Sequence, residues 1–251
     1  MPTSYGAICS DFYINSKLTL KMDLPAGRET VLELFERIRR EAPDLRRFRR
    51  YHDELALESI HRDDGPEKWV ALQKHSVRCG VVNPDSLEAG YRLHELVMTL
   101  SPYYLTINPL DVAAMEVVFG FDLEAGGNHH AIIHDALLAG SSLGSLVDSD
   151  EQSLMDVQPV IGAALTKSRE LRAFYEVKAR TGPRQIEQSP EREEPISVYL
   201  TVRRQGAAPD DIRELTDIFK GLCEHAESLS ESRVIPHLLS PLRESIASQR
   251  F

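Results

Sequence analysis

Short segments in which apolar and polar residues alternate constrain the fold of this chain more than any other feature. Residues 17–24 (KLTLKMDL) place every apolar side chain on one face and every polar side chain on the other. Residues 115–123 (MEVVFGFDL) likewise place large apolar side chains on one face, those of Met115, Val117, Phe119, Phe121 and Leu123. A period of two is typical of a strand with one face against a core. Further strands are predicted at 48–59, 68–82, 155–166, 170–180 and 196–204.

Helical periodicity separates these strands. Val31, Leu34, Phe35 and Ile38 recur at the spacing of one helix face, within residues 28–41. Asn83-Pro84-Asp85 supplies capping and first-turn residues for a helix over about 85–100. Other helices are predicted over about 128–139 and 209–229, followed by a short C-terminal helix broken by Pro236 and Pro241. The order of elements is then β-α-β-β-α in the first half and β-α-β-β-β-α-α in the second.

The two halves share this order and a short stretch of letters, DLPAG at 23–27 and DLEAG at 122–126. We therefore predict an internal duplication of a β-α-β-β unit. The expected fold class is α+β, a mainly antiparallel sheet with helices on one face and ferredoxin-like or helix-grip character. One domain is expected, with halves of about 1–104 and 105–251. A single sheet is favoured because Asn108-Pro109 is too short for a linker.

Charge and composition narrow the classes of partner. The formal net charge is −10, and an acidic surface repels both nucleic acid and anionic membranes. No secretory signal is recognisable, and no stretch approaches the ~18 uninterrupted apolar residues of a membrane helix. Cys9, Cys79 and Cys223 are widely spaced and typical of reduced thiols. We expect a cytoplasmic protein that binds small molecules or proteins, with no nucleic-acid or membrane partner.

Residues 140–144 (GSSLG) match the Gly-x-Ser-x-Gly pattern of a serine nucleophile. In that motif the serine follows a strand and precedes a helix. Here the preceding residues are helical, so the order of elements is reversed. Gly140 is better interpreted as the glycine that ends a helix in the left-handed conformation.

Histidines just upstream suggest a divalent metal site. His130 and His134 are one helical turn apart, and Asp135 or Asp122 can supply an oxygen ligand. Ala131 occupies the position of the catalytic glutamate in HExxH, so zinc-protease chemistry lacks its base. The alternatives are an ordinary surface helix capped by Asn128, and an anion site at the helix N-terminus formed by the same amides.

An arginine cluster is the other unusual feature. Residues 37–50 hold seven arginines and two acidic residues, a local excess of five positive charges. Guanidinium groups can grip an anion or an acidic partner surface, and they can also pair with the protein's own carboxylates. The residues proposed for anion or partner binding are Arg46, Arg47, Arg49 and Arg50.

No set of acid, base and nucleophile fits its structural context, so the expected function is that of a non-enzymatic binding or assembly protein. It would associate with itself or with another protein through the open sheet face or the arginine cluster. One alternative is a metal-dependent, hydrolase-like enzyme centred on His130 and His134. The other is a pocket between sheet and helices that holds a small molecule.

Overall fold

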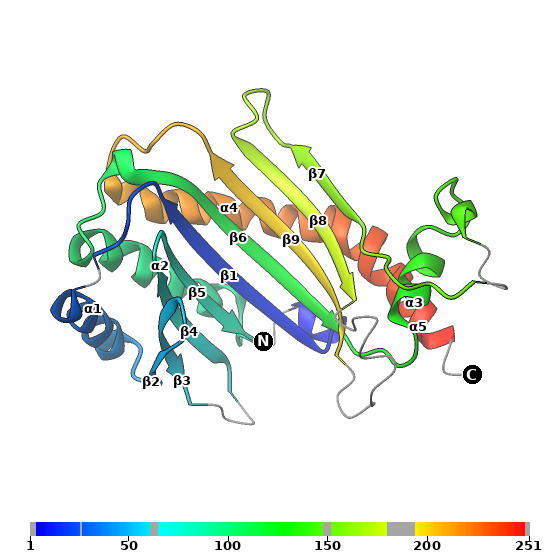
Figure 1. Cartoon of the computed structure of the whole chain (residues 1–251), viewed down its shortest axis with the longest axis horizontal. Coiled ribbons are helices and arrows are strands. Elements are labelled where there is room, and N and C mark those ends of the chain that lie inside the picture. The colour runs from blue at the N-terminus through cyan, green and yellow to red at the C-terminus, as the bar shows by residue number, and fades with distance from the viewer. Residues whose placement is uncertain (1–3, 26, 61–64, 148–151, 180–193, 249–251) are drawn as a thin grey trace.

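The computed structural model describes residues 4–25, 27–60, 65–147, 152–179 and 194–248. Its strands form a nine-stranded antiparallel sheet in the order β2-β3-β4-β5-β1-β6-β9-β8-β7 (Figure 1). The strands are β1 (Asp11–Leu20), β2 (Leu45–Arg50), β3 (Glu54–Ser59), β4 (Glu67–Gln73), β5 (Ser76–Val82), β6 (Val112–Leu123), β7 (Val160–Ala164), β8 (Leu171–Ala179) and β9 (Ile196–Gln205).

The first strand of each half lies at the centre of the sheet. β1 pairs with β6 in antiparallel register, with Ile14 opposite Phe119. The last strand of each half, β5 or β9, lies on the outer side of that pair. The two sheet edges are therefore β2, from the first half, and β7, from the second. The strands of both halves join in one sheet.

Helices cover one face of the sheet. The alternation in β1 buries Phe12, Ile14 and Leu18 on that face. Against it pack α2, which contacts β1 and β5, and α4, which contacts β6 and β9. The helices are α1 (Arg28–Glu41), α2 (Leu87–Tyr104), α3 (His129–Leu137), α4 (Leu215–Leu229) and α5 (Ser240–Ser248). In Figure 1 the opposite face is turned to the viewer, and no helix of the described residues crosses it. The predicted α+β class, with an antiparallel sheet and helices on one face, is confirmed.

Two predicted strands are wrong in their boundaries because each contains a hairpin. Residues 48–59 divide into β2 and β3, and residues 68–82 divide into β4 and β5. The second hairpin turns tightly at Lys74 and His75, and Gln73 faces Ser76 across it. Polar residues at such turns also fit the polar face of a strand, so alternation alone does not reveal the break. The first half is therefore β-α-β-β-β-β-α.

The strand predicted at 17–24 begins and ends earlier, as β1. Met22 is exposed instead of lying on the buried face. Its amide donates to the side chain of Asp111, and the amide of Leu24 donates to the carbonyl of Lys74. These contacts hold residues 21–24 outside the sheet, where Met22 is exposed and Leu24 still packs against the core.

The predicted break in the C-terminal helix is also wrong. α4 runs into a π-helix, Ser230–Leu239, and then directly into α5. Pro236 lies inside the π-helix. Proline has no amide hydrogen to donate in either kind of helix, but the wider π-helical turn gives its ring room beside the preceding carbonyls, so the chain stays helical.

The internal duplication stays a prediction. The letters shared at 23–27 and 122–126 do not occupy the same structural position: Asp23 follows the end of β1, whereas Asp122 lies inside β6 and faces Asp11. Ala26 lies outside the described residues. The order of elements also differs, because the first half places more strands between its helices than the second.

Candidate functional site

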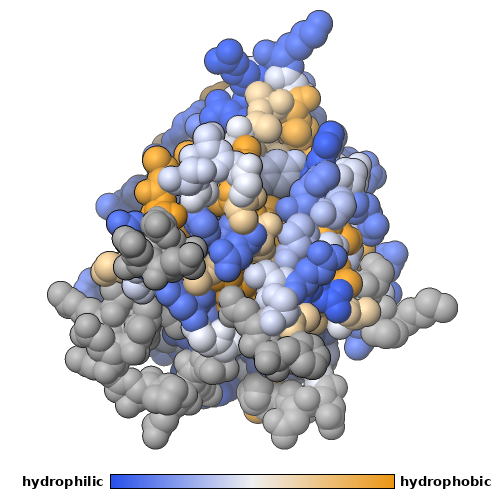
Figure 2. Space-filling model, turned by 90° about the vertical axis from the view of Figure 1, so that its right-hand side faces the viewer, coloured by the Kyte–Doolittle hydropathy of each residue, from blue (hydrophilic) through white to orange (hydrophobic). Residues whose placement is uncertain are grey.

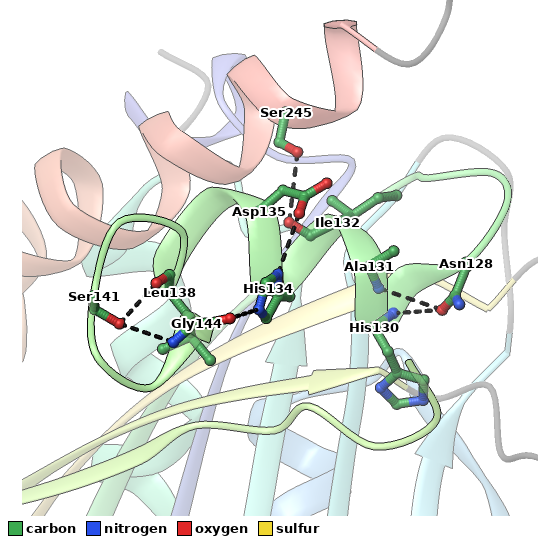
Figure 3. Close-up of polar contacts among 10 residues, drawn as sticks. All are labelled: Asn128, His130, Ala131, Ile132, His134, Asp135, Leu138, Ser141, Gly144 and Ser245. Carbon is green, nitrogen blue, oxygen red and sulfur yellow. Dashed lines mark hydrogen bonds and ion pairs between the residues drawn. The ribbon is translucent and has the colours of Figure 1, made fainter. Parts of the chain in front are cut away.

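His130 and His134 lie on α3, which begins where the sequence predicts. The Asn128 side chain accepts hydrogen bonds from the amides of His130 and Ala131, which caps the helix (Figure 3). Only 2% of His130 is exposed. Its Nδ1 accepts a hydrogen bond from the amide of Val157, at 3.0 Å. That lone pair therefore fixes the segment before β7 against α3, as expected of a satisfied structural histidine.

His134 is engaged by different partners. Its Nδ1 lies 3.2 Å from a carboxylate oxygen of Asp135, and its Nε2 lies 3.2 Å from the carbonyl oxygen of Gly144. Figure 3 shows the His134 ring between Asp135 and Gly144, apart from the His130 ring. Across the described ranges, no group of three or more histidine, cysteine, aspartate or glutamate side chains is placed to hold a metal ion. The metal site at His130, His134 and Asp135 stays a prediction.

Residues 140–144 form the turn after α3. Gly140 has φ +79°, which confirms the predicted left-handed conformation. The Ser141 hydroxyl donates to the carbonyl of Leu138 and accepts from the amide of Gly144, so it closes the turn (Figure 3). Ser142, the serine of the Gly-x-Ser-x-Gly pattern, lies in this same turn after a helix, so the strand–turn–helix geometry of a nucleophile is absent from this segment.

Arg46, Arg47, Arg49 and Arg50 lie on the edge strand β2, and all four are exposed. Arg46 donates to the carbonyl of Pro43. Arg49 forms an ion pair with Glu58 on β3, at 3.3 Å. Some of these guanidinium groups therefore contact the protein itself, although all four side chains are exposed to solvent. Binding of an anion or a partner by the cluster stays a prediction.

A buried serine, histidine and cysteine meet between β1, β5 and α2. Nδ1 of His94 lies 2.8 Å from Oγ of Ser16 and 3.1 Å from Sγ of Cys79. Burial lowers the pKa of His94 to about 3 and raises the pKa of Cys79 to about 12. Both groups are uncharged at neutral pH and closed off from substrate, so the cluster fastens α2 to the sheet and is no reactive site.

Cavities on the helix side offer little for the pocket alternative. One of ≈ 300 Å³ lies between α4 and the ends of β8 and β9, beside Leu171 and Leu222. Another, of ≈ 490 Å³, lies along α1 and is lined by charged residues such as Glu33 and Arg37. Neither combines an apolar lining with convergent buried polar groups, which small-molecule sites have.

The open face of the sheet carries side chains that the sequence did not single out. We call one line of neighbouring residues across six strands the central row. The registers place it through Trp69, Gly80, Asn15, Val118, Thr201 and Phe174, from β4 to β8. None of these residues is charged, and at ~4.8 Å per strand the row spans about 24 Å. It forms an uncharged band with an aromatic residue at each end.

Two glycines let aromatic rings lie flat on this face. A Cβ added at Gly120 would collide with the ring of Tyr13, and one added at Gly80 would collide with the indole of Trp69. The Tyr13 hydroxyl donates to Asp122, at 3.2 Å, and the Tyr13 ring meets Tyr199 edge-on at 6.1 Å between centroids. The Tyr13 ring is therefore held in place by packing and hydrogen bonding, and the Trp69 ring by packing.

A basic row flanks the central row on one side. It runs through Arg78, Lys17, Glu116, Arg203 and Arg172 on β5, β1, β6, β9 and β8. Arg203 donates to Glu116 at 2.6 Å and its guanidinium lies 5.6 Å from the Phe174 ring centroid. Arg78 lies 5.4 Å from the Trp69 ring centroid. Cations thus stack on both terminal aromatics of the central row.

The sequence held part of the signal for this surface. Tyr13 and Asn15 precede the segment predicted as a strand at 17–24. Extending the alternation back to Asp11 would have placed Tyr13, Asn15 and Lys17 on one polar face. Which residues of other strands join them depends on strand order, and no local pattern specifies that order.

Comparison of the chain with protein-family models, with curated proteins and with solved structures gives no match. Within the described residues, no helix has the length and apolar composition that crossing a bilayer requires.

Proposed function

We propose that this protein is a non-enzymatic binding protein that holds a partner protein on the open face of its sheet. The observation that carries the proposal is the central row: an uncharged band about 24 Å long, at ~4.8 Å per strand, with aromatic rings at both ends. Rigid aromatic rings with a polar rim are typical of protein interfaces.

The basic row indicates the chemistry of the partner. It contains four cations and one carboxylate, that of Glu116. An extended segment of a partner with acidic side chains along one side would place its backbone over the central row and its carboxylates beside Lys17 and Arg172. Single-stranded nucleic acid is the less suitable occupant, because the chain has a net charge of −10 and electropositive binding grooves drive such complexes.

Site-specific photo-cross-linking tests this proposal. A photoreactive residue at Thr201, in the middle of the central row, is expected to trap one discrete protein in extracts of the cells that make this chain. The matched control is Met22, which is exposed outside the sheet. Trapping of the same proteins at both positions, or of none at Thr201, would show that the open face is not a binding surface.

The purified partner then supplies the second measurement. Lys17→Glu combined with Arg172→Glu is expected to raise the Kd at least about tenfold, because charge reversal opposes acidic side chains. Arg37→Glu, on α1, is the control and should leave the Kd unchanged. An unchanged Kd in the open-face variant would contradict the proposed docking of an acidic segment.

A further inference from the structure

The free edge of β7 is an uncharged apolar strand. Its sequence is VIGAA, and all five residues are exposed. The exposed fraction is 57% for Val160 and 64% for Ile161. β7 is the last strand of the sheet, so no strand of the described residues pairs with its outer side. An edge with free backbone groups and apolar side chains is a template for pairing with another chain.

Its hydrogen-bonding pattern shows which groups face outward. On the β8 side, the amide of Val177 donates to the carbonyl of Pro159, and the amide of Leu165 donates to the carbonyl of Leu171. Antiparallel ladders alternate between bonded and non-bonded pairs. The amides and carbonyls of Val160, Gly162 and Ala164 therefore point away from β8, with Gly162 at the middle.

This arrangement is self-complementary. When two copies of β7 lie antiparallel with Gly162 opposite Gly162, Val160 of each copy faces Ala164 of the other. Every outward amide then meets an outward carbonyl. On the helix side of the sheet, Ile161 of each copy faces Ala163 of the other, so a large side chain meets a small one. At the centre the glycines have no side chain to separate the backbones.

The opposite edge cannot form the same contact. β2 carries Arg46, Arg47, Arg49 and Arg50, all exposed, so two copies of β2 would bring eight guanidinium groups together. Pairing β7 with the β2 of another copy would leave one edge open at each end and form an open fibre. Only β7 with β7 closes on itself.

We infer that this protein forms a two-fold dimer in which β7 of one copy pairs with β7 of a second copy, about Gly162. The dyad is perpendicular to the sheet, so the two open faces lie on the same side and become one continuous surface. Figure 2 looks at the end of the molecule that holds β7, α3 and α5, and shows apolar patches among hydrophilic residues there. Other exposed apolar side chains in the segment leading to β7 are Leu143, Leu146 and Met155.

The test is the molar mass of the purified full chain across protein concentrations, by sedimentation equilibrium or light scattering. The wild type is expected to pass from one 28.3 kDa chain to two as concentration rises. Ala164→Pro removes an outward amide and leaves the bonds to β8 intact, so the dimer Kd should rise at least about tenfold. Ile161→Lys should raise the dimer Kd by a similar factor, and it does so without placing a proline in the strand.

Met22→Lys is the matched control, because it places the same charge at an equally exposed apolar residue outside β7. A wild type that stays at one chain mass at every concentration overturns the inference. So does a dimer that both β7 variants leave unchanged, or one that Arg49→Glu on β2 dissolves instead. The dimer contact lies on the edge of β7 and the proposed partner site on the open face, so the two proposals can fail separately. Cross-linking from Thr201 in the monomeric β7 variants tests the partner site alone.

Discussion

The two edge strands of this sheet, β2 and β7, differ in whether they permit pairing with another chain. Both β2 and β7 end the hydrogen-bonded ladder, and both are exposed. β2 has arginine at four of its six positions, whereas β7 has no charged residue. Charge on an edge strand opposes edge-to-edge association, and its absence permits it. The arginines of β2 therefore oppose pairing with another chain, whereas the side chains of β7 permit it.

The edges also differ in how they are fastened. Phe48 of β2 packs its ring against Phe35 of α1, with centroids 5.8 Å apart. β7 has no comparable anchor among the described residues, and its ladder to β8 is its main attachment. A strand held mainly by backbone bonds is a good acceptor for a further strand, because pairing completes its hydrogen bonding on both sides.

Acid should unfold both edge strands together, because both are attached to one hydrophobic core. The pKa of His94 is lowered to about 3 by burial, so the folded state excludes a proton that the unfolded state accepts below about pH 6.5. The contribution of His94 to stability is therefore full above about pH 6.5 and falls by about 1.4 kcal/mol per unit as the pH drops towards 3, or roughly a hundredfold in the unfolding constant over two units.

Denaturant titrations at a series of pH values measure this slope. His94→Gln keeps polar atoms near Ser16 and Cys79 and does not titrate, so the variant should lose most of the slope. His225→Gln, at an exposed position on α4, is the control and should keep it. Equal slopes in the wild type and in His94→Gln would show that His94 is not the group responsible.

Replacing arginines on β2 should reduce the difference between β2 and β7 in their tendency to pair with another chain. Arg47→Val with Arg49→Val leaves β2 with two arginines instead of four, so its repulsion of a second strand falls and each copy offers a second edge that can pair. Open-ended association then becomes possible, and the weight-average mass should increase at least about tenfold at high concentration. Light scattering measures it, and Arg47→Lys with Arg49→Lys is the control. A double-valine variant that retains the wild-type mass would contradict the guarding role of arginine.

The difference in fastening should appear in stability. Phe48→Ala removes the ring contact with Phe35 and should cost about 1 kcal/mol, roughly fivefold in the unfolding constant, because Phe48 is 51% exposed. Ile161→Ala on β7 should cost under about 0.5 kcal/mol in the monomer. Both values come from denaturant unfolding at low protein concentration. A larger cost at Ile161 than at Phe48 would reverse the comparison.

Amide hydrogen exchange should give the smallest but most local difference. The outward amides of β7, at Val160, Gly162 and Ala164, should exchange about threefold more slowly when two thirds of the chains are paired. The outward amides of β2, at Phe48 and Arg50, should exchange at a rate independent of concentration. Concentration-dependent protection of the β2 amides would show that the dimer contact lies at β2 and not at β7.

The sequence predicted elements far better than it predicted neighbours. Alternation found the segments of β6, β8 and β9, and helical periodicity found α1 and α3, because burial of one face imposes a period along the chain. The hairpins inside 48–59 and 68–82 escaped detection, since their turn residues fit the polar face of a strand. The π-helix at Pro236 escaped as well, because local rules predict that proline ends a helix.

The candidate sites illustrate the same limit. Asn128 was correctly identified as a cap, because capping depends on residues three or fewer apart. The partners of His130 and His134, Val157 and Gly144, come from segments whose return to α3 the sequence did not show. The central row combines residues from six strands, and apart from Trp69 and Gly80 on one hairpin its adjacent members lie far apart in the chain.

By itself, the sequence determined the α+β class, the covered face of the segments at 17–20 and 115–123, and the contrast between an arginine-rich segment and VIGAA, because these follow from local periodicity and side-chain chemistry. Only the tertiary structure decided that these two segments are the opposite edges of one sheet and that Tyr13 lies over Gly120. Strand order and register arise from packing between segments distant in the chain, so they are properties of the assembled core and of no segment alone.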